Sequence, residues 1–262
     1  MPDSNDNWLG PARGSRMVVA GGCGGIGRQL VQEAVAHGIE VLVLDLPQSR
    51  AAGPDVAGAA YLDFDGRDPE SIRQAVDAIG ARWDGVDSFV FLCGYPILPR
   101  RPLAEIPLQA WNELMQVNLT SAYLLGGALV PLLSRGGQAS IVTVASSLAY
   151  QVMPGMGAYA TSKAALVGLT KALAMECAPR IRANAVAPGA VDTDFLGGGS
   201  GRQSNLDRSW FDAMAEKYVA TIPLGRVARP EDVVGPILFL AGPASAYMTG
   251  QVLHLNGGRL TP

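Results

Sequence analysis

Short apolar runs alternate with longer amphipathic segments along nearly the whole chain. The short runs are rich in β-branched residues and predict strands at 16–21, 40–46, 59–64, 87–94, 139–146, 181–189 and 251–257. The longer segments predict helices at 25–38, 68–83, 108–133 and 230–242, and a further helix that begins near residue 157. Strands that are apolar throughout and alternate with helices are typical of a parallel sheet covered on both faces. We therefore expect a doubly wound α/β domain with three layers.

The chain shows no internal repeat and no linker that would divide it, so residues 16–262 are expected to form a single domain. Residues 1–15 are polar and contain glycine and proline, which predicts a flexible tail rather than a signal peptide. A glycine-rich segment at about 194–220 interrupts the alternation of strands and helices. Because glycines provide hinges, we expect this segment to close over a substrate.

Composition and charge exclude several classes of function. The 262 residues carry a net charge of −3, and the densest basic cluster is the pair Arg100–Arg101, so we expect no nucleic-acid partner. The three cysteines and two histidines follow no metal-ligand spacing, so we expect no metal site. Few, scattered cysteines and the absence of a leader pattern favour the cytoplasm.

One uncharged segment, from Leu114 to Leu133, has the length of a membrane span. Polar residues and a proline lie inside it, and its apolar residues cluster toward one end. These features favour a buried or subunit-interface helix over a membrane helix. We expect no association with a membrane.

A glycine-rich loop follows the first predicted strand. Gly21, Gly25 and Gly27 stand where this strand turns into a helix. Without Cβ atoms, such a loop lets backbone N–H groups approach a pyrophosphate at the positive end of the helix. The order of strand, loop and helix predicts a dinucleotide site.

Asp45 ends the second predicted strand, 18 residues after Gly27. A carboxylate at this point accepts hydrogen bonds from the adenosine ribose and repels a 2′-phosphate, which favours NAD over NADP. Leu46 and Pro47 follow it, so no basic side chain comes next to bind a phosphate. The alternative is that Asp45 only begins a turn.

Tyr159 and Lys163 lie four residues apart at the start of a predicted helix, and hence on one face of it. An unperturbed tyrosine titrates near pH 10. A neighbouring ammonium and a positive nicotinamide ring would lower its pKa. The phenol could then exchange a proton with an alcohol or a ketone as an acid/base catalyst.

Two more polar residues complete this candidate site. Ser146 ends the fifth predicted strand, 13 residues before Tyr159, and could hydrogen-bond the substrate oxygen. Its neighbour Ser147 is the weaker candidate on spacing. Asn118 lies in the uncharged helix, where it could link a water molecule to Lys163. The alternative for Asn118 is a purely structural amide.

These motifs, in this order, resemble the short-chain dehydrogenase/reductase family from Arg16 to Gly258. The loop "AGGCGGIG" is similar to its TGxxxGxG motif, "APGAVDT" at 187–193 to its PGxxxT segment, and the stretch from 223 to 258 to its C-terminal part. The resemblance implies a single-domain Rossmann fold, hydride transfer with a nicotinamide cofactor, and a homo-oligomer, either a dimer or a tetramer. It implies the catalytic set Asn118, Ser146, Tyr159 and Lys163. It also implies cofactor contacts from Gly21, Gly25, Ile26, Gly27, Asp45, Asp63, Gly94, Tyr159, Lys163, Pro188, Val191 and Thr193.

The chain departs from the family pattern at the cofactor loops. Ala20 stands where the family has a threonine, and Leu92–Cys93 stand where it has polar residues. Ala20 and Leu92–Cys93 are all apolar, so neither position leaves a buried polar group at the other without a hydrogen-bond partner. The departures remove no catalytic group.

The sequence therefore predicts an NAD-dependent oxidoreductase that interconverts a secondary alcohol and its ketone, with Tyr159 as acid/base. One alternative is a 3-oxoacyl-thioester reductase that uses NADPH, against which Asp45 argues. Another is a catalytically silent nucleotide-binding sensor, against which the complete catalytic set argues. The substrate itself depends on loop shape, which one sequence does not determine.

Overall fold

The computed structural model describes residues 8–136, 139–199 and 215–261. Residues 1–7 of the predicted tail and residues 200–214 of the predicted substrate loop lie outside this part. The description below refers to these three ranges.

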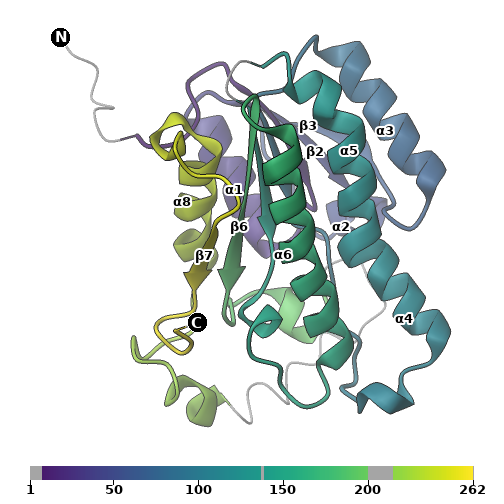
Figure 1. The fold of residues 1–262 in the computed structure, drawn as a ribbon, viewed down its shortest axis with the longest axis vertical. Coiled ribbons are helices and arrows are strands. Elements are labelled where there is room, and N and C mark those ends of the chain that lie inside the picture. The colour runs from purple at the N-terminus through teal and green to yellow at the C-terminus, as the bar shows by residue number, and fades with distance from the viewer. Residues whose placement is uncertain (1–7, 137–138, 200–214, 262) are drawn as a thin grey trace.

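A parallel sheet of seven strands forms the middle layer, in the order β3-β2-β1-β4-β5-β6-β7 (Figure 1). Every neighbouring pair is parallel. All the predicted strands are present, each shorter than its apolar run. They are β1 (Arg16–Ala20), β2 (Glu40–Asp45), β3 (Ala60–Asp63), β4 (Ser88–Phe91), β5 (Ala139–Val144), β6 (Ile181–Pro188) and β7 (Val252–Leu255).

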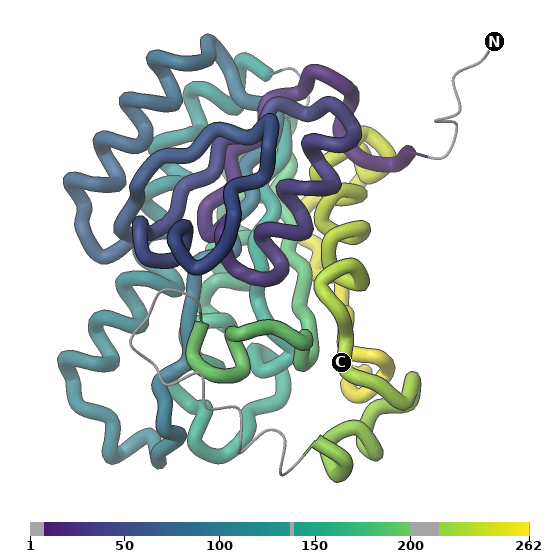
Figure 2. Tube along the Cα trace, turned by 180° about the vertical axis from the view of Figure 1, so that it is seen from behind, coloured from purple at the N-terminus to yellow at the C-terminus, as the bar shows by residue number. Residues whose placement is uncertain are grey.

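Helices cover both faces of the sheet, as the two opposite views show (Figures 1 and 2). The larger ones are α1 (Gly25–Ala36), α3 (Pro69–Arg82), α4 (Leu108–Met115), α5 (Ser121–Leu133), α6 (Gly157–Cys177) and α8 (Pro230–Ala241). Shorter turns of helix are α2 (Pro47–Ala51), η1 (Leu103–Glu105), η3 (Ser147–Ala149), η4 (Asp194–Gly197) and η5 (Pro243–Ser245). The sequence pattern did not predict α2, because its five residues are too few to show a helical period.

Two apolar cores, one on each side of the sheet, hold these layers together. Val18 and Ala20 of β1 face the core shared with α3, α5 and α6. Met17 and Val19, which alternate with them, face the core shared with α1 and α8. Successive strand residues point to opposite faces, so burial on both faces requires an unbroken apolar run. The three-layer α/β/α architecture predicted from the sequence is confirmed.

The strand order reverses between β1 and β4, because the chain builds β1 to β3 outward in one direction and β4 to β7 in the other. In such sheets the loops at the carboxyl ends of the strands diverge at the reversal and leave a crevice. The loops after β1, β2, β4, β5 and β6 meet at this edge, and their residues line one cavity. The fold thus determines where a ligand site forms.

The predicted helix at 108–133 is interrupted in the structure. α4 passes through a π-helical turn, η2 (Gln116–Thr120), into α5. This is the one helix of the described chain that is long and apolar enough to cross a membrane by length and composition alone. Leu125, Leu129 and Leu133 along one side of it pack into the sheet core, as expected for a core helix.

Residues 8–15, which belong to the predicted flexible tail, contact the domain in the structure. The Trp8 indole stacks on His37 with ring centroids 3.6 Å apart. The backbone N–H of Gly14 donates to the carbonyl of Gly38 at 2.8 Å. The aromatic side chain buries apolar area against the domain, which offsets the entropy lost by ordering the segment.

Candidate active site

The glycine loop after β1 is shaped by close contacts that exclude side chains. Gly21 has φ +85°, and a Cβ atom there would lie 2.8 Å from the backbone nitrogen of Cys93. A Cβ atom at Gly27 would lie 2.4 Å from the carbonyl oxygen of Gly21, and one at Gly25 would lie 2.5 Å from Cγ2 of Thr193. Only glycine fits these positions without displacing backbone or a packed side chain. The loop leads directly into α1, so the first N–H groups of that helix face the cavity edge.

Asp45 ends β2 beside this loop. Its carboxylate accepts hydrogen bonds from the backbone N–H of Cys23 at 2.7 Å and from that of Leu46 at 2.8 Å. Burial raises the pKa of Asp45, and these backbone bonds oppose that rise. The carboxylate is thus held against the glycine loop while it lines the cavity. Its position fits a contact with the adenosine ribose.

The cavity wall beyond β3 differs from the sequence-based expectation. Asp63, the predicted adenine contact, is the exposed last residue of β3 and does not line the cavity. Phe64, Asp65 and Gly66 line it instead. The Asp65 carboxylate pairs with Arg67 at 2.6 Å, which holds this loop at the cavity edge. Asp63 is therefore not placed to contact a ligand in the cavity, whereas the three residues that follow it are.

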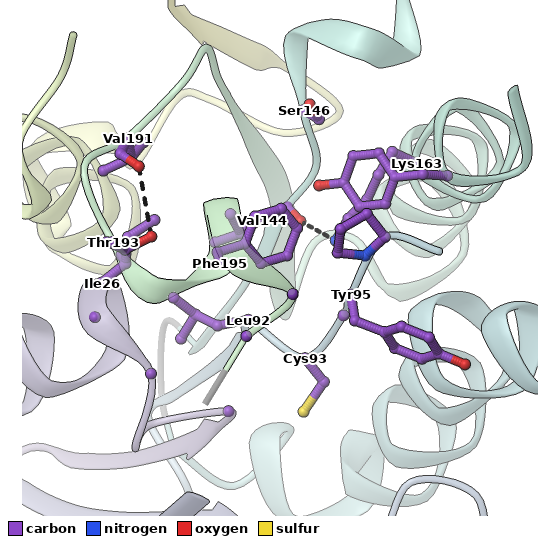
Figure 3. A pocket seen from close by; sticks show the side chains of 18 of the residues that line it. Ile26, Leu92, Cys93, Tyr95, Val144, Ser146, Lys163, Val191, Thr193 and Phe195 are labelled. Carbon is purple, nitrogen blue, oxygen red and sulfur yellow. Dashed lines mark hydrogen bonds between the residues drawn. The ribbon is translucent and has the colours of Figure 1, made fainter. Parts of the chain in front are cut away.

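Tyr159 and Lys163 lie one turn apart in the first half of α6, and both line the cavity. Tyr159 is 6% exposed and Lys163 is 3% exposed. The Lys163 ammonium donates to the carbonyl oxygen of Val144 at 2.8 Å and lies 5.8 Å from the centre of the Tyr159 ring. Figure 3 shows the hydrogen bond between Lys163 and Val144 and labels Ser146 and Phe195 among the residues that line the same cavity.

Burial changes the proton affinities of both residues. It raises the pKa of the Tyr159 phenol, and a hydrogen bond with the Ser146 hydroxyl acts in the opposite direction. It lowers the pKa of Lys163 to about 8. The expected lowering of the Tyr159 pKa by Lys163 is absent from the protein alone, because the desolvation of a buried phenolate dominates. Lys163 is poised to gain or lose its proton near neutral pH.

Ser146 follows β5 in an extended conformation and lines the cavity near Tyr159. Its hydroxyl accepts a hydrogen bond from the N–H of Leu148 at 3.2 Å, which fixes its direction, and it also bonds the phenol. Ser147 lines the same cavity. The bond to Tyr159 favours Ser146 as the serine that shares a substrate oxygen with the phenol.

Asn118 lies behind the cavity wall rather than on it, fully buried in the π-helical turn. Its side-chain oxygen accepts from the N–H of Tyr95 at 3.0 Å, and its amide donates to the Tyr95 carbonyl at 3.1 Å and to the Ser162 hydroxyl at 3.0 Å. A Cβ atom at Gly94 would meet both the Lys163 ammonium and the Asn118 oxygen within 3.2 Å. Asn118 therefore braces the loop after β4 and lies close to Lys163.

The loop after β6 closes the cavity opposite α6. Pro188, Val191 and Thr193 line it, and the Thr193 hydroxyl donates to the Val191 carbonyl at 3.5 Å. The contact between Thr193 and Gly25 joins this loop to the glycine loop. Of the predicted site residues, only Asn118 and Asp63 do not line the cavity in the described part of the chain.

These features fit a dinucleotide along the carboxyl edge of the sheet. The glycine cradle could hold the pyrophosphate, Asp45 the adenosine ribose, Lys163 the other ribose, and Val191 with Thr193 the nicotinamide amide. The apolar departures also fit. The backbone N–H of Leu92 donates to the Ala20 carbonyl at 2.8 Å, while Leu92 and Cys93 pack against the two cores.

Comparisons with known proteins agree with this geometry. The sequence profile described as "Enoyl-(Acyl carrier protein) reductase" matches residues 21–259. A 3-oxoacyl-[acyl-carrier-protein] reductase of Aquifex aeolicus (strain VF5) is 31% identical over 254 residues, covering 94% of this chain and 97% of the relative. An L-2,3-butanediol dehydrogenase of Corynebacterium glutamicum is 32% identical over 253 residues, covering 93% and 97%. The solved structure of Thermoplasma acidophilum aldohexose dehydrogenase has a TM-score of 0.83 at 26% identity, covering 95% of this chain and 98% of that one.

The chain belongs to the short-chain dehydrogenase/reductase family. It is therefore an oxidoreductase that uses a nicotinamide nucleotide.

In this short-chain dehydrogenase/reductase, several cavity residues had no sequence signal. Arg100, Met153, Met156 and Tyr218 line the cavity. Spacing cannot reveal such residues, because they come from separate loops that meet only in the folded chain. The sequence did indicate an acidic residue near the end of β3, because Asp63 and Asp65 are two positions apart. Which of the two lines the cavity depends on where the strand ends.

Proposed function

We propose that this protein is an NAD-dependent oxidoreductase that interconverts a secondary alcohol and its ketone. The observation that carries this proposal is the convergence of Ser146, Tyr159 and Lys163 on one cavity whose other end carries Asp45. The first three residues supply proton transfer to an oxygen atom, and Asp45 supplies the preference for a dinucleotide without a 2′-phosphate.

The chain's own residues bind the substrate oxygen and transfer the proton. The Ser146 hydroxyl and the Tyr159 phenol both bind the substrate oxygen and so orient the reacting carbon. Tyr159 gives its proton to the oxygen of a ketone, or takes one from an alcohol. Lys163 stabilises the phenolate and holds the ribose nearest to it. When bound, the nicotinamide accepts or supplies the hydride.

Proton transfer by Tyr159 is tested by replacing it with phenylalanine. Tyr159→Phe keeps the ring that packs against Phe195, with ring centroids 5.7 Å apart, and removes only the hydroxyl. We expect kcat on a panel of ketones and secondary alcohols to fall by about 10²- to 10⁴-fold, while NADH still binds. Tyr150→Phe is the matched control, because Tyr150 packs on His254 outside the cavity. Unchanged turnover in Tyr159→Phe would refute the assigned role.

A 3-oxoacyl-thioester reductase that uses NADPH is the second candidate, favoured by the similarity to a reductase of that name in Aquifex aeolicus. Two features argue against it: the Asp45 carboxylate repels a 2′-phosphate, and α4 and α5 carry no lysine or arginine to receive an acidic carrier protein. Acetoacetyl-CoA and a free ketone, each assayed with NADH and NADPH, separate the two. A higher kcat/KM for the thioester with NADPH would favour the second candidate.

A nucleotide-binding sensor without turnover is the third candidate. It would bind NADH, with a dissociation constant that responds to Asp45→Ala, but it would reduce neither ketones nor thioesters. The presence of all four catalytic residues argues against it.

We also propose that the protein works in the cytoplasm as a homo-oligomer of two or four subunits. Leu108, Tyr123 and Met175 on α4, α5 and α6 are 72%, 60% and 81% exposed. Large apolar side chains on neighbouring helices favour burial against another copy. Light scattering coupled to gel filtration measures the mass, and a monomer at micromolar concentration would contradict this proposal.

A further inference from the structure

The part of the cavity beyond Tyr159 is lined mainly by apolar side chains. Leu148, Met153, Met156 and Phe195 belong to one cluster with Tyr159, and all of them line the cavity. They come from the segment between β5 and α6 and from the loop after β6. A substrate whose oxygen lies at Ser146 and Tyr159 would extend along this apolar wall. We refer to this region as the substrate half.

Arg100 interrupts that wall. It lies in the loop after β4, is half-buried, and lines the cavity. Its Cβ atom lies close to Gly155, where φ is +77° and an added Cβ atom would lie 2.9 Å from Cβ of Arg100. Gly155 comes four residues before Tyr159, so the arginine is held against the segment that leads into the catalytic helix. Its neighbour Arg101 does not line the cavity.

In the described chain, the acidic side chains that line the cavity lie at its cofactor end: Asp45 ends β2 and Asp65 follows β3. Of the basic side chains that line it, Arg67 pairs with Asp65 at that end. Arg100 and Lys163 lie on the side of β4, β5 and α6. Burial lowers the pKa of Arg100 and so disfavours its charge. A guanidinium nevertheless stays protonated in proteins, so Arg100 presents a positive charge to the substrate half.

We propose that Arg100 binds a carboxylate of the substrate, so that the substrates are hydroxy acids and oxo acids with an apolar spacer between the carboxylate and the reacting carbon. This inference rests on the function proposed above and names the substrate class of the same site. The spacer follows from the apolar residues Met153 and Met156, which flank Gly155 and precede Tyr159. A planar guanidinium matches a carboxylate with two parallel hydrogen bonds, which gives direction as well as affinity.

The test compares acids with neutral amides of the same shape. The probes are 4-oxopentanoate against 4-oxopentanamide, and 4-oxocyclohexanecarboxylate against its carboxamide, all with NADH. In the wild type we expect kcat/KM to be higher for each acid. In Arg100→Met we expect the acids to lose about 10- to 150-fold, mostly through KM, because a hydrogen bond to a charged group contributes about 1.5–3 kcal/mol. The amides should change little.

Two further variants separate charge from shape. Arg100→Lys keeps the positive charge but cannot form the two parallel hydrogen bonds of a guanidinium, and it should recover part of the preference for acids. Arg101→Met removes a half-buried arginine next in sequence that does not line the cavity, and should leave the preference intact. If Arg100→Met weakens acids and amides equally, Arg100 only shapes the loop and the proposal is wrong. If the wild type reduces both classes equally well, this inference fails while the proposed function stands.

A binding measurement makes the inference independent of turnover. Cyclohexanecarboxylate and cyclohexanecarboxamide carry no reactive carbonyl and are titrated calorimetrically into the protein saturated with NADH. Binding of the acid that is tighter than that of the amide, and that is lost in Arg100→Met but not in Arg101→Met, supports the inference even if no ketone is reduced. Equal binding of both compounds to the wild type overturns it.

Discussion

Asn118 makes three buried hydrogen bonds, and their loss in Asn118→Ala should cost much of the folding stability. Two of them hold the N–H and the carbonyl of Tyr95, and the third reaches the Ser162 hydroxyl, which also donates to the Tyr159 carbonyl at 2.7 Å. Removing the partner of a buried polar group costs about 1–3 kcal/mol. The two bonds to Tyr95 alone therefore predict a loss of about 2–6 kcal/mol, against about 5–15 kcal/mol for a typical domain.

Urea denaturation followed by tryptophan fluorescence measures this loss as a change in midpoint at constant slope. Gln116→Ala is the control in the same π-helical turn, since Gln116 makes one half-buried bond, to the Gly66 carbonyl at 3.1 Å. We expect it to lose about 0.5–1.5 kcal/mol. A loss below about 1 kcal/mol in Asn118→Ala would refute the idea that this amide braces the loop after β4, and would favour a role confined to catalysis.

Asn118→Asp refines the same test with a side chain of nearly equal shape. The new carboxylate can still accept from the Tyr95 N–H but cannot donate to the Tyr95 carbonyl. Burial raises the pKa of such a carboxyl above its unfolded value of about 4, and the nearby Lys163 ammonium limits this rise. The folded state then binds more protons, so the stability of the variant relative to wild type should fall as pH rises from about 4 to 7. A difference independent of pH over this range would contradict the assigned geometry.

Three further predictions concern other parts of the site. Burial lowers the pKa of Lys163 to about 8 from 10.5, so the stability of wild type relative to Lys163→Met should rise between about pH 8 and 10.5; a flat difference in unfolding free energy would contradict this. Gly27→Ala places a Cβ atom 2.4 Å from the Gly21 carbonyl and should lower Tm, whereas Gly80→Ala, exposed in α3 with its nearest such contact at 4.0 Å, should raise stability by about 0.5–1 kcal/mol. Asp45→Ser should raise the Kd for NADH about tenfold or more and bring it closer to the Kd for NADPH, both measured by fluorescence titration. Unchanged Kd values would remove the basis for the NAD preference.

The fold could be predicted from the sequence because its determinants are local and repeated. Each strand of a sheet covered on both faces is apolar at most positions, and each helix follows with its own period. The pattern could not show the π-helical turn at 116–120, because every residue there is compatible with an α-helix. It also could not place Trp8 against His37, a contact between segments that only folding brings together.

The candidate catalytic pair could also be predicted from the sequence, since Tyr159 and Lys163 are four residues apart on one helix and therefore share a face whatever surrounds them. The predicted cofactor contact of Asp63, by contrast, depended on more than spacing along the chain. Asp63 and Asp65 both follow the apolar run of β3, and the residue that lines the cavity depends on where the strand ends and the chain turns.

The sequence by itself determined four features: an α/β sheet, a glycine loop, an acid at the end of the second strand, and a phenol one helical turn from an ammonium. Each of these depends on spacing within one element or between neighbours along the chain. The tertiary structure alone decided that Asn118 braces Tyr95, that burial raises the proton affinity of Tyr159, and that Arg100 lies beside Gly155 at the substrate half. These depend on desolvation and on contacts between distant loops, which arise only when the chain closes around the cavity.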